Sequence, residues 1–125
     1  TYRPLFDGAI PDAKDYFREI GRAAGKMHEA GIYHKDFSRG NILIGRTEQG
    51  IRTEFVDLNR ISFKKNIDLQ LGCKNFERLP ANDEMIAWLA EGYAAQRGFD
   101  PEECRQYIAE YRAKQVEKHP NHIKK

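Results

Sequence analysis

The chain has 125 residues, a length that suits one domain with a buried core. Its 40% hydrophobic and 32% charged residues, with a net charge of +2, exclude extended disorder and give no charge-based reason to expect a nucleic-acid partner. Cys73 and Cys104 lie far apart in the sequence without metal-ligand spacing, which favours reduced thiols over a disulfide framework or a zinc site. No apolar run reaches the length of a membrane span, so we expect a soluble protein.

A first helix is expected after an irregular segment over residues 1–10. It begins at Pro11 and ends at Gly31, where glycine allows the left-handed backbone that often follows a helix. Its apolar side chains recur at steps of three and four residues, as on one face of a helix: Tyr16, Phe17, Ile20, Ala24 and Met27. A loop over residues 33–41 should follow.

A β-hairpin is expected next. The apolar residues 42–44 form a short strand, residues 47–50 look like a turn, and residues 51–56 return with alternating apolar and charged side chains. Asp57 would then lie at the end of the second strand. The hairpin should bring Asp36 and Asp57 within reach of one ion.

Residues 61–81 have no sustained period, and we expect a loop with short helical turns. This segment is basic, with the cationic residues Lys64, Lys65, Lys74 and Arg78. Such a cluster can meet phosphate or an anionic membrane surface, although a solvated rim of lysines is the more common explanation.

Two helices should complete the fold over residues 82–118. Asn82 is a capping residue before a helix that runs to about Arg97, and Asp100-Pro101 begins the second helix. Residues 1–125 are therefore expected to form one domain, mostly α with a small β-hairpin.

The residues that indicate chemistry lie in the loop over residues 33–44 and in the segment over residues 55–60. Asp36 can orient a hydroxyl, while Asn41 and Asp57 offer the oxygen ligands that Mg²⁺ prefers. Taken singly, His34 could be a structural histidine, Asp36 a cap and Asn41 a turn residue. Their shared spacing instead indicates phosphoryl transfer.

This set resembles the catalytic loop and metal-binding aspartate of kinases, with Asp57-Leu58-Asn59 at the place of Asp-Phe-Gly. The sequence of segments 36–43, 56–60 and 72–76 resembles bacterial small-molecule and lipopolysaccharide kinases of the Kdo/WaaP type more than eukaryotic protein kinases. The resemblance implies the C-terminal lobe of a protein-kinase-like fold. It also implies the use of ATP and Mg²⁺ to phosphorylate a sugar hydroxyl of the lipopolysaccharide core.

By the same resemblance, Asp36 is the catalytic base and His34 braces the metal-binding segment, while Asn41 and Asp57 are metal ligands. The expected nucleotide-binding residues are Asn41, Arg39 and Ser38.

Three residues depart from the pattern of protein kinases. Lys35 replaces the arginine of protein kinases, and Ser38 stands where they place a phosphate-contacting lysine. That contact is either missing or made by Arg39. Asn59 replaces a glycine, which is tolerable because asparagine also adopts left-handed backbone angles.

No glycine-rich loop or strand lysine precedes the motif, and only 33 residues come before His34. The chain is either a fragment of a longer kinase or a free-standing half without the nucleotide-binding lobe. We favour the fragment, with the N-terminal lobe elsewhere in the parent chain, and expect the isolated chain to bind nucleotide poorly and to be inactive. The expected partners are ATP, a sugar or lipopolysaccharide-type acceptor and that missing lobe, with no nucleic acid. The expected location is cytoplasmic, with peripheral contact at the inner membrane as an open alternative. A kinase of another small hydroxylated molecule and a non-catalytic kinase-like binding domain also remain open.

Overall fold

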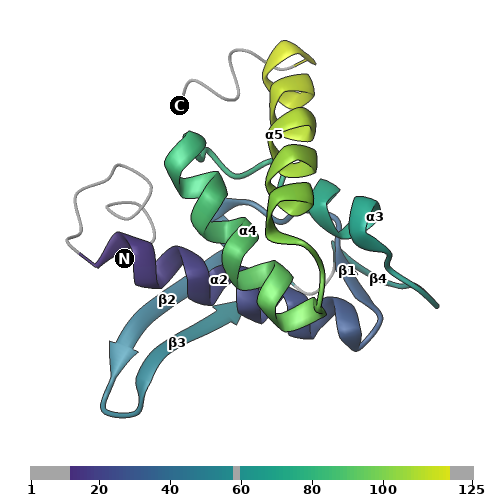
Figure 1. Cartoon of the computed structure of the whole chain (residues 1–125). Helices are drawn as coiled ribbons and strands as arrows, with labels where there is room; N and C mark the ends of the chain where they lie inside the picture. The colour runs from purple at the N-terminus through teal and green to yellow at the C-terminus, as the bar shows by residue number, and fades with distance from the viewer. Residues whose placement is uncertain (1–11, 58–59, 119–125) are drawn as a thin grey trace.

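A computed structural model describes residues 12–57 and 60–118 of the chain (Figure 1). The helices in chain order are α2 (Ala13–Glu29), α3 (Leu69–Lys74), α4 (Asp83–Arg97) and α5 (Pro101–Lys118). The strands are β1 (Ile32–His34), β2 (Ile42–Thr47), β3 (Gly50–Phe55) and β4 (Ile61–Phe63), with a short 3₁₀ turn η1 (Arg39–Asn41) before β2. The expected irregular start, the polar tail and residues 58–59 lie outside the described residues. Within them the chain is mostly helical with a small β-hairpin, as the sequence predicts.

Helices α2 and α4 cross in close contact at the centre of the molecule (Figure 1). Two glycines make this approach possible. A Cβ atom at Gly92 would lie 1.9 Å from the carbonyl oxygen of Arg18, and one at Gly21 would lie 2.2 Å from that of Leu89. Any larger side chain at either position would therefore force the helices apart.

The hairpin is confirmed: β2 and β3 pair antiparallel, with Ile42 opposite Phe55 and Thr47 opposite Gly50. A second sheet was not predicted. In it β1 pairs with β4, and His34 lies opposite Ile61. The expected loop over residues 33–41 is therefore wrong at its start, because Tyr33 and His34 belong to β1. Strands of three residues are too short to show a period.

The segment over residues 61–81, expected as a loop with short helical turns, contains β4 and the two-turn helix α3. Asp68 caps α3, since its Oδ1 accepts a hydrogen bond from the backbone N–H of Leu71 at 2.8 Å. The prediction of helical turns is thus partly correct, and the strand was missed. Together these elements bring residues 60–63 against the strand that precedes the catalytic loop.

The two C-terminal helices begin where the sequence predicts. Asn82 Oδ1 accepts a hydrogen bond from Met85 N–H at 2.9 Å, and Asp100 Oδ2 accepts one from Glu103 N–H at 3.0 Å. Between them α4 ends at Gly98, whose φ of 74° is left-handed.

The core lies between α4, its neighbours α2 and α5, and the hairpin. Its largest fully buried apolar side chains are Phe17, Ile20, Phe37, Ile42, Ile67, Phe76, Leu79, Leu89, Tyr93 and Ile108. Among the described residues, no helix is both long enough and apolar enough to cross a bilayer.

Candidate active site

The loop between β1 and β2 folds around the backbone and side chain of Asp36. Its carbonyl oxygen accepts hydrogen bonds from Ser38 N–H at 3.0 Å and from Asn41 Nδ2 at 2.8 Å. Asn41 Nδ2 also lies 3.2 Å from Asp36 Oδ2. Because the amide nitrogen of Asn41 faces Asp36, its Oδ1 is the atom that remains to coordinate a cation.

The segment before Asp57 is joined to this loop by both backbone groups of Val56. Its N–H donates to the carbonyl of Asn41 at 2.9 Å, and its carbonyl accepts from His34 Nε2 at 2.7 Å. Asp57 follows at once with a φ of 63°, a left-handed angle that aspartate adopts more readily than most residues. Asp57 is therefore held close to the catalytic loop, because the residue before it, Val56, is hydrogen-bonded to Asn41.

His34 is fully buried, and its ring is bonded on both sides. Nδ1 accepts a hydrogen bond from the backbone N–H of Asp36 at 3.1 Å, so the proton is on Nε2, which donates to Val56. The ring thus connects the loop of Asp36 to the segment of Asp57. A buried ring with both nitrogens occupied supports bracing and does not favour contact with a substrate.

Arg78 is a site residue that the sequence did not single out beyond its basic neighbourhood. Its Nη1 lies 3.3 Å from Asp36 Oδ1, and both side chains are partly exposed. Among the described contacts of Lys74 is the ring of Tyr111, 6.0 Å from its Nζ, on α5. The expected basic cluster is therefore divided: Arg78 contacts Asp36, whereas Lys64 Nζ lies 5.5 Å from the centre of the Tyr33 ring. Forty-two residues separate Arg78 from Asp36, so no local sequence pattern reports the contact.

The remaining predicted cations and hydroxyls contribute backbone contacts. Ser38 accepts a hydrogen bond from Asn41 N–H at 3.0 Å through its carbonyl. Arg39 opens η1, and its side chain lies outside the described part of the structure. Lys35 is exposed, and its N–H donates to the carbonyl of Arg60 at 2.7 Å.

A chain of hydrogen-bonded polar side chains, which we call the polar chain, is joined to the carbonyl of His34: the buried Asn75, His28 and Tyr93, and the partly buried Arg97. Asn75 Nδ2 donates to the carbonyl of His34 at 2.7 Å, and its Oδ1 lies 2.8 Å from His28 Nε2. His28 Nδ1 lies 2.7 Å from the Tyr93 hydroxyl, which also accepts from Arg97 Nη1 at 2.8 Å.

The chemistry of these groups fixes the direction of every bond in the polar chain. Since Asn75 must donate to a carbonyl, its Oδ1 faces His28, and His28 must carry its proton on Nε2. Nδ1 of His28 is then an acceptor, and the Tyr93 hydroxyl donates to it. Burial lowers the pKa of His28 to about 4, the hydrogen bond to Asn75 opposing this shift, so the ring is neutral at pH 7. Burial also raises the pKa of Tyr93, which keeps its hydroxyl protonated.

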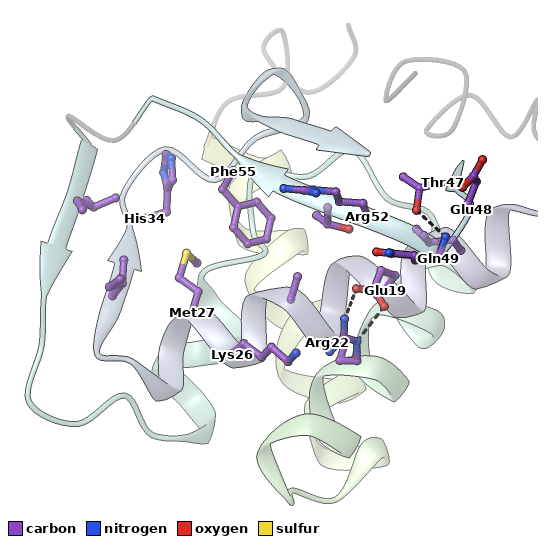
Figure 2. A pocket seen from close by; sticks show the side chains of 15 residues that line it. Glu19, Arg22, Lys26, Met27, His34, Thr47, Glu48, Gln49, Arg52 and Phe55 are labelled. Atoms are coloured by element: carbon purple, nitrogen blue, oxygen red, sulfur yellow. Dashed lines mark hydrogen bonds and ion pairs between the residues drawn. The ribbon is translucent and has the colours of Figure 1, made fainter. Parts of the chain in front are cut away.

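A groove of about 990 Å³, which we call the α2–β3 groove, lies between α2 and β3 and is closed by residues of β1 and β4 (Figure 2). Met27 and Phe55 are among its apolar lining residues, and Arg22 and Arg52 are among its charged ones. His34 lines it, but Asp36, Asn41 and Asp57 do not. The groove therefore adjoins the bracing histidine and is separate from the acids.

The candidate cation ligands are Asn41 Oδ1 and the carboxylate of Asp57, both hard oxygens that fit Mg²⁺. Within residues 12–57 and 60–118, no three His, Cys, Asp or Glu side chains gather into a metal cluster. A pair of protein ligands is nevertheless ordinary for Mg²⁺, which keeps several waters and binds substrate phosphates.

A helical lobe that holds an acid, an amide and a second acid in this order has the arrangement of a protein-kinase-like C-terminal lobe. Residues 11–111 match the Lipopolysaccharide kinase (Kdo/WaaP) family. The chain belongs to this family, as the resemblance in the catalytic loop predicted.

Curated relatives extend the kinase assignment. The chain is 30% identical to a probable serine/threonine-protein kinase BUD32 homolog of Archaeoglobus fulgidus, over 91% of this chain and 60% of that protein. It is 26% identical to the EKC/KEOPS complex subunit BUD32 of Yarrowia lipolytica, over 88% of this chain and 46% of that protein. A shorter match, 38% identical over 42% of this chain and 22% of the relative, is to the KEOPS complex subunit Bud32 of Pyrococcus abyssi. The chain therefore spans less than two thirds of the length of each of these relatives.

Proposed function

We propose that the complete protein transfers the γ-phosphoryl group of magnesium-ATP to a sugar hydroxyl of the lipopolysaccharide core. The observation that carries the proposal is the double contact of Asn41 Nδ2 with the backbone and carboxylate of Asp36. This contact fixes the acid and leaves Asn41 Oδ1 as the side-chain atom that can coordinate a cation. The family match supports lipopolysaccharide as the acceptor class.

In this proposal Asp36 orients the acceptor hydroxyl and takes its proton as the oxygen attacks the γ-phosphorus. The bond from the γ-phosphorus to its bridging oxygen breaks, and ADP leaves. Asn41 and Asp57 would hold Mg²⁺, which neutralises charge on the phosphates. His34 and Val56 keep the two acids in register. The nucleotide-binding lobe would come from the rest of the parent chain, and the protein would work in the cytoplasm or at the inner face of a membrane.

A protein serine or threonine hydroxyl is the second candidate acceptor. The supporting observation is the 30% identity, over 91% of this chain, to a relative named as a probable serine/threonine-protein kinase. Both candidates use the same chemistry at Asp36, so only the acceptor distinguishes them.

The experiment incubates the complete protein with Mg²⁺ and γ-³²P-labelled ATP, and with either purified core oligosaccharide or a serine-rich protein such as casein. Transfer to the oligosaccharide that disappears in Asp36→Asn and persists in Asp83→Asn would support the proposal. Asp83 is a matched control because it is an exposed acid in the first turn of α4. Labelling of casein alone would favour the second candidate, and no transfer to either acceptor would contradict both.

A further inference from the structure

Both carboxylate oxygens of Asp36 are occupied when no substrate is present. Oδ2 lies 3.2 Å from Asn41 Nδ2, and Oδ1 lies 3.3 Å from Arg78 Nη1. The backbone carbonyl of Asn41 accepts a hydrogen bond from Val56 N–H, so Asn41 is attached to the segment that carries Asp57. Oδ1, the oxygen beside Arg78, is therefore the one left for an acceptor hydroxyl.

Stability does not explain why an arginine lies at this oxygen. The side chains of Arg78 and Asp36 are 43% and 31% exposed, and they share one long contact instead of two parallel ones. A single ion pair open to water contributes little to folding. The contact is thus weak enough to be exchanged for a better partner.

A phosphate or carboxylate group is such a partner, because a guanidinium can donate two parallel hydrogen bonds to it. Two further exposed cationic residues follow close by in the fold: Lys35 precedes Asp36, and its N–H donates to the carbonyl of Arg60. Ser38, by contrast, contributes no positive charge within the loop itself.

We propose that Arg78 is an acceptor-positioning residue: it leaves Asp36 to bind an anionic group that the acceptor carries close to its reacting hydroxyl. This inference rests on the proposed function and deepens it, because it restricts the acceptor to hydroxyl compounds with a neighbouring phosphate or carboxylate. Binding of the anion and release of Asp36 Oδ1 are then one event. A neutral acceptor would find the acid still paired.

The first test needs no turnover. The Nε–H resonance of Arg78 is followed in the ¹⁵N-labelled complete protein, assigned by its loss in Arg78→Lys, during titration with inorganic phosphate and separately with acetate. A saturable shift at Arg78 that exceeds the shift at Arg105 is expected, and the anion with the tighter curve identifies the acceptor group. Arg105 is the matched control because it is a partly exposed arginine paired with an acid, Glu102, on α5. If neither anion moves Arg78 more than Arg105, the inference is overturned.

The second test measures transfer to the core oligosaccharide. Arg78→Ala should raise the KM for the acceptor about tenfold or more, the usual loss for a hydrogen bond between charged groups, while the KM for magnesium-ATP stays unchanged. Arg78→Lys should recover part of the loss, and Arg105→Ala should change neither constant. A fall in kcat with an unchanged acceptor KM would show that Arg78 acts only on Asp36, and would overturn the inference. An inactive wild-type protein would count against the proposed function, and the titration would still decide the role of Arg78.

Discussion

The exposed acid loop and the buried polar chain beneath it show two ways of using polar residues. Asp36, Asp57 and Arg78 reach solvent, so their contacts can be exchanged for ligands at small cost. His28 and Asn75 are buried, and each bond they make removes a desolvation penalty that would otherwise remain. We therefore expect the exposed residues to take part in the chemistry and the buried residues to set the position of the loop. Substitutions in the two regions should separate catalysis from stability.

The largest effect is expected for Asp36→Asn in the complete protein. An amide cannot accept the hydroxyl proton, so the transfer rate should fall about a thousandfold. The free energy of unfolding should change by less than about 1 kcal/mol, because the ion pair to Arg78 is exposed. Transfer of labelled phosphate and urea denaturation measure the two quantities, and an unchanged rate would show that Asp36 is not the base.

Asn75→Ala should have the opposite effect, a large loss of stability. It leaves the carbonyl of His34 and Nε2 of His28 buried without partners, and should reduce the free energy of unfolding by about 3 kcal/mol. Gln96→Ala, which removes an exposed hydrogen bond to Glu29, is the control and should cost less than about 0.5 kcal/mol. Equal losses in the two variants by urea denaturation would mean that the polar chain does not hold the loop.

Acid should weaken the polar chain through His28. Its pKa is about 4 in the folded protein and 6.5 as a free group, so the unfolded chain takes up the proton first as the pH falls. The stability that neutral His28 contributes is complete above pH 6.5 and is lost progressively between pH 6.5 and 4, by about 2 kcal/mol at pH 5. His28→Gln keeps one donor and one acceptor but does not titrate. Its unfolding free energy should therefore depend less on pH over this range, and parallel pH curves would refute the assignment.

The smallest effect is expected for Asp57→Asn. Removing one carboxylate from the candidate Mg²⁺ ligands should weaken magnesium-dependent nucleotide binding about tenfold, with little change in stability because Asp57 is exposed. Calorimetric titration of the complete protein with nucleotide, with and without Mg²⁺, would measure this. An equal loss in the absence of Mg²⁺ would assign Asp57 a role other than metal binding.

Local patterns made part of this molecule predictable. Asn82 and Asp100 mark helix starts because a cap is made within three residues, and Gly31 marks the end of α2 because its φ of 79° is left-handed. The hairpin was predictable because its strands are adjacent and its turn is short. The spacing of Asp36 and Asn41 was also readable, since both lie in one loop.

Contacts between residues far apart in the chain could not be predicted from the sequence. His28 and Asn75 meet over 47 residues, and Arg78 meets Asp36 over 42. Each of these side chains alone has an ordinary surface or packing explanation, and only the fold brings them together. The pairing of β1 with β4 was hidden for the same reason, because neither strand is long enough to alternate visibly.

At Val56 the structure requires two backbone hydrogen bonds, and this requirement places little restriction on which amino acid stands there. Its N–H and its carbonyl fasten the metal segment to the loop, and neither group belongs to the side chain. Nineteen of the twenty amino acids could supply both groups, and proline is the exception because it has no N–H. Relatives could therefore have different amino acids at this position while keeping the same two backbone hydrogen bonds. A comparison of this family that scores residue identity alone could therefore rank position 56 as variable, although the placement of Asp36 and Asp57 depends on its backbone.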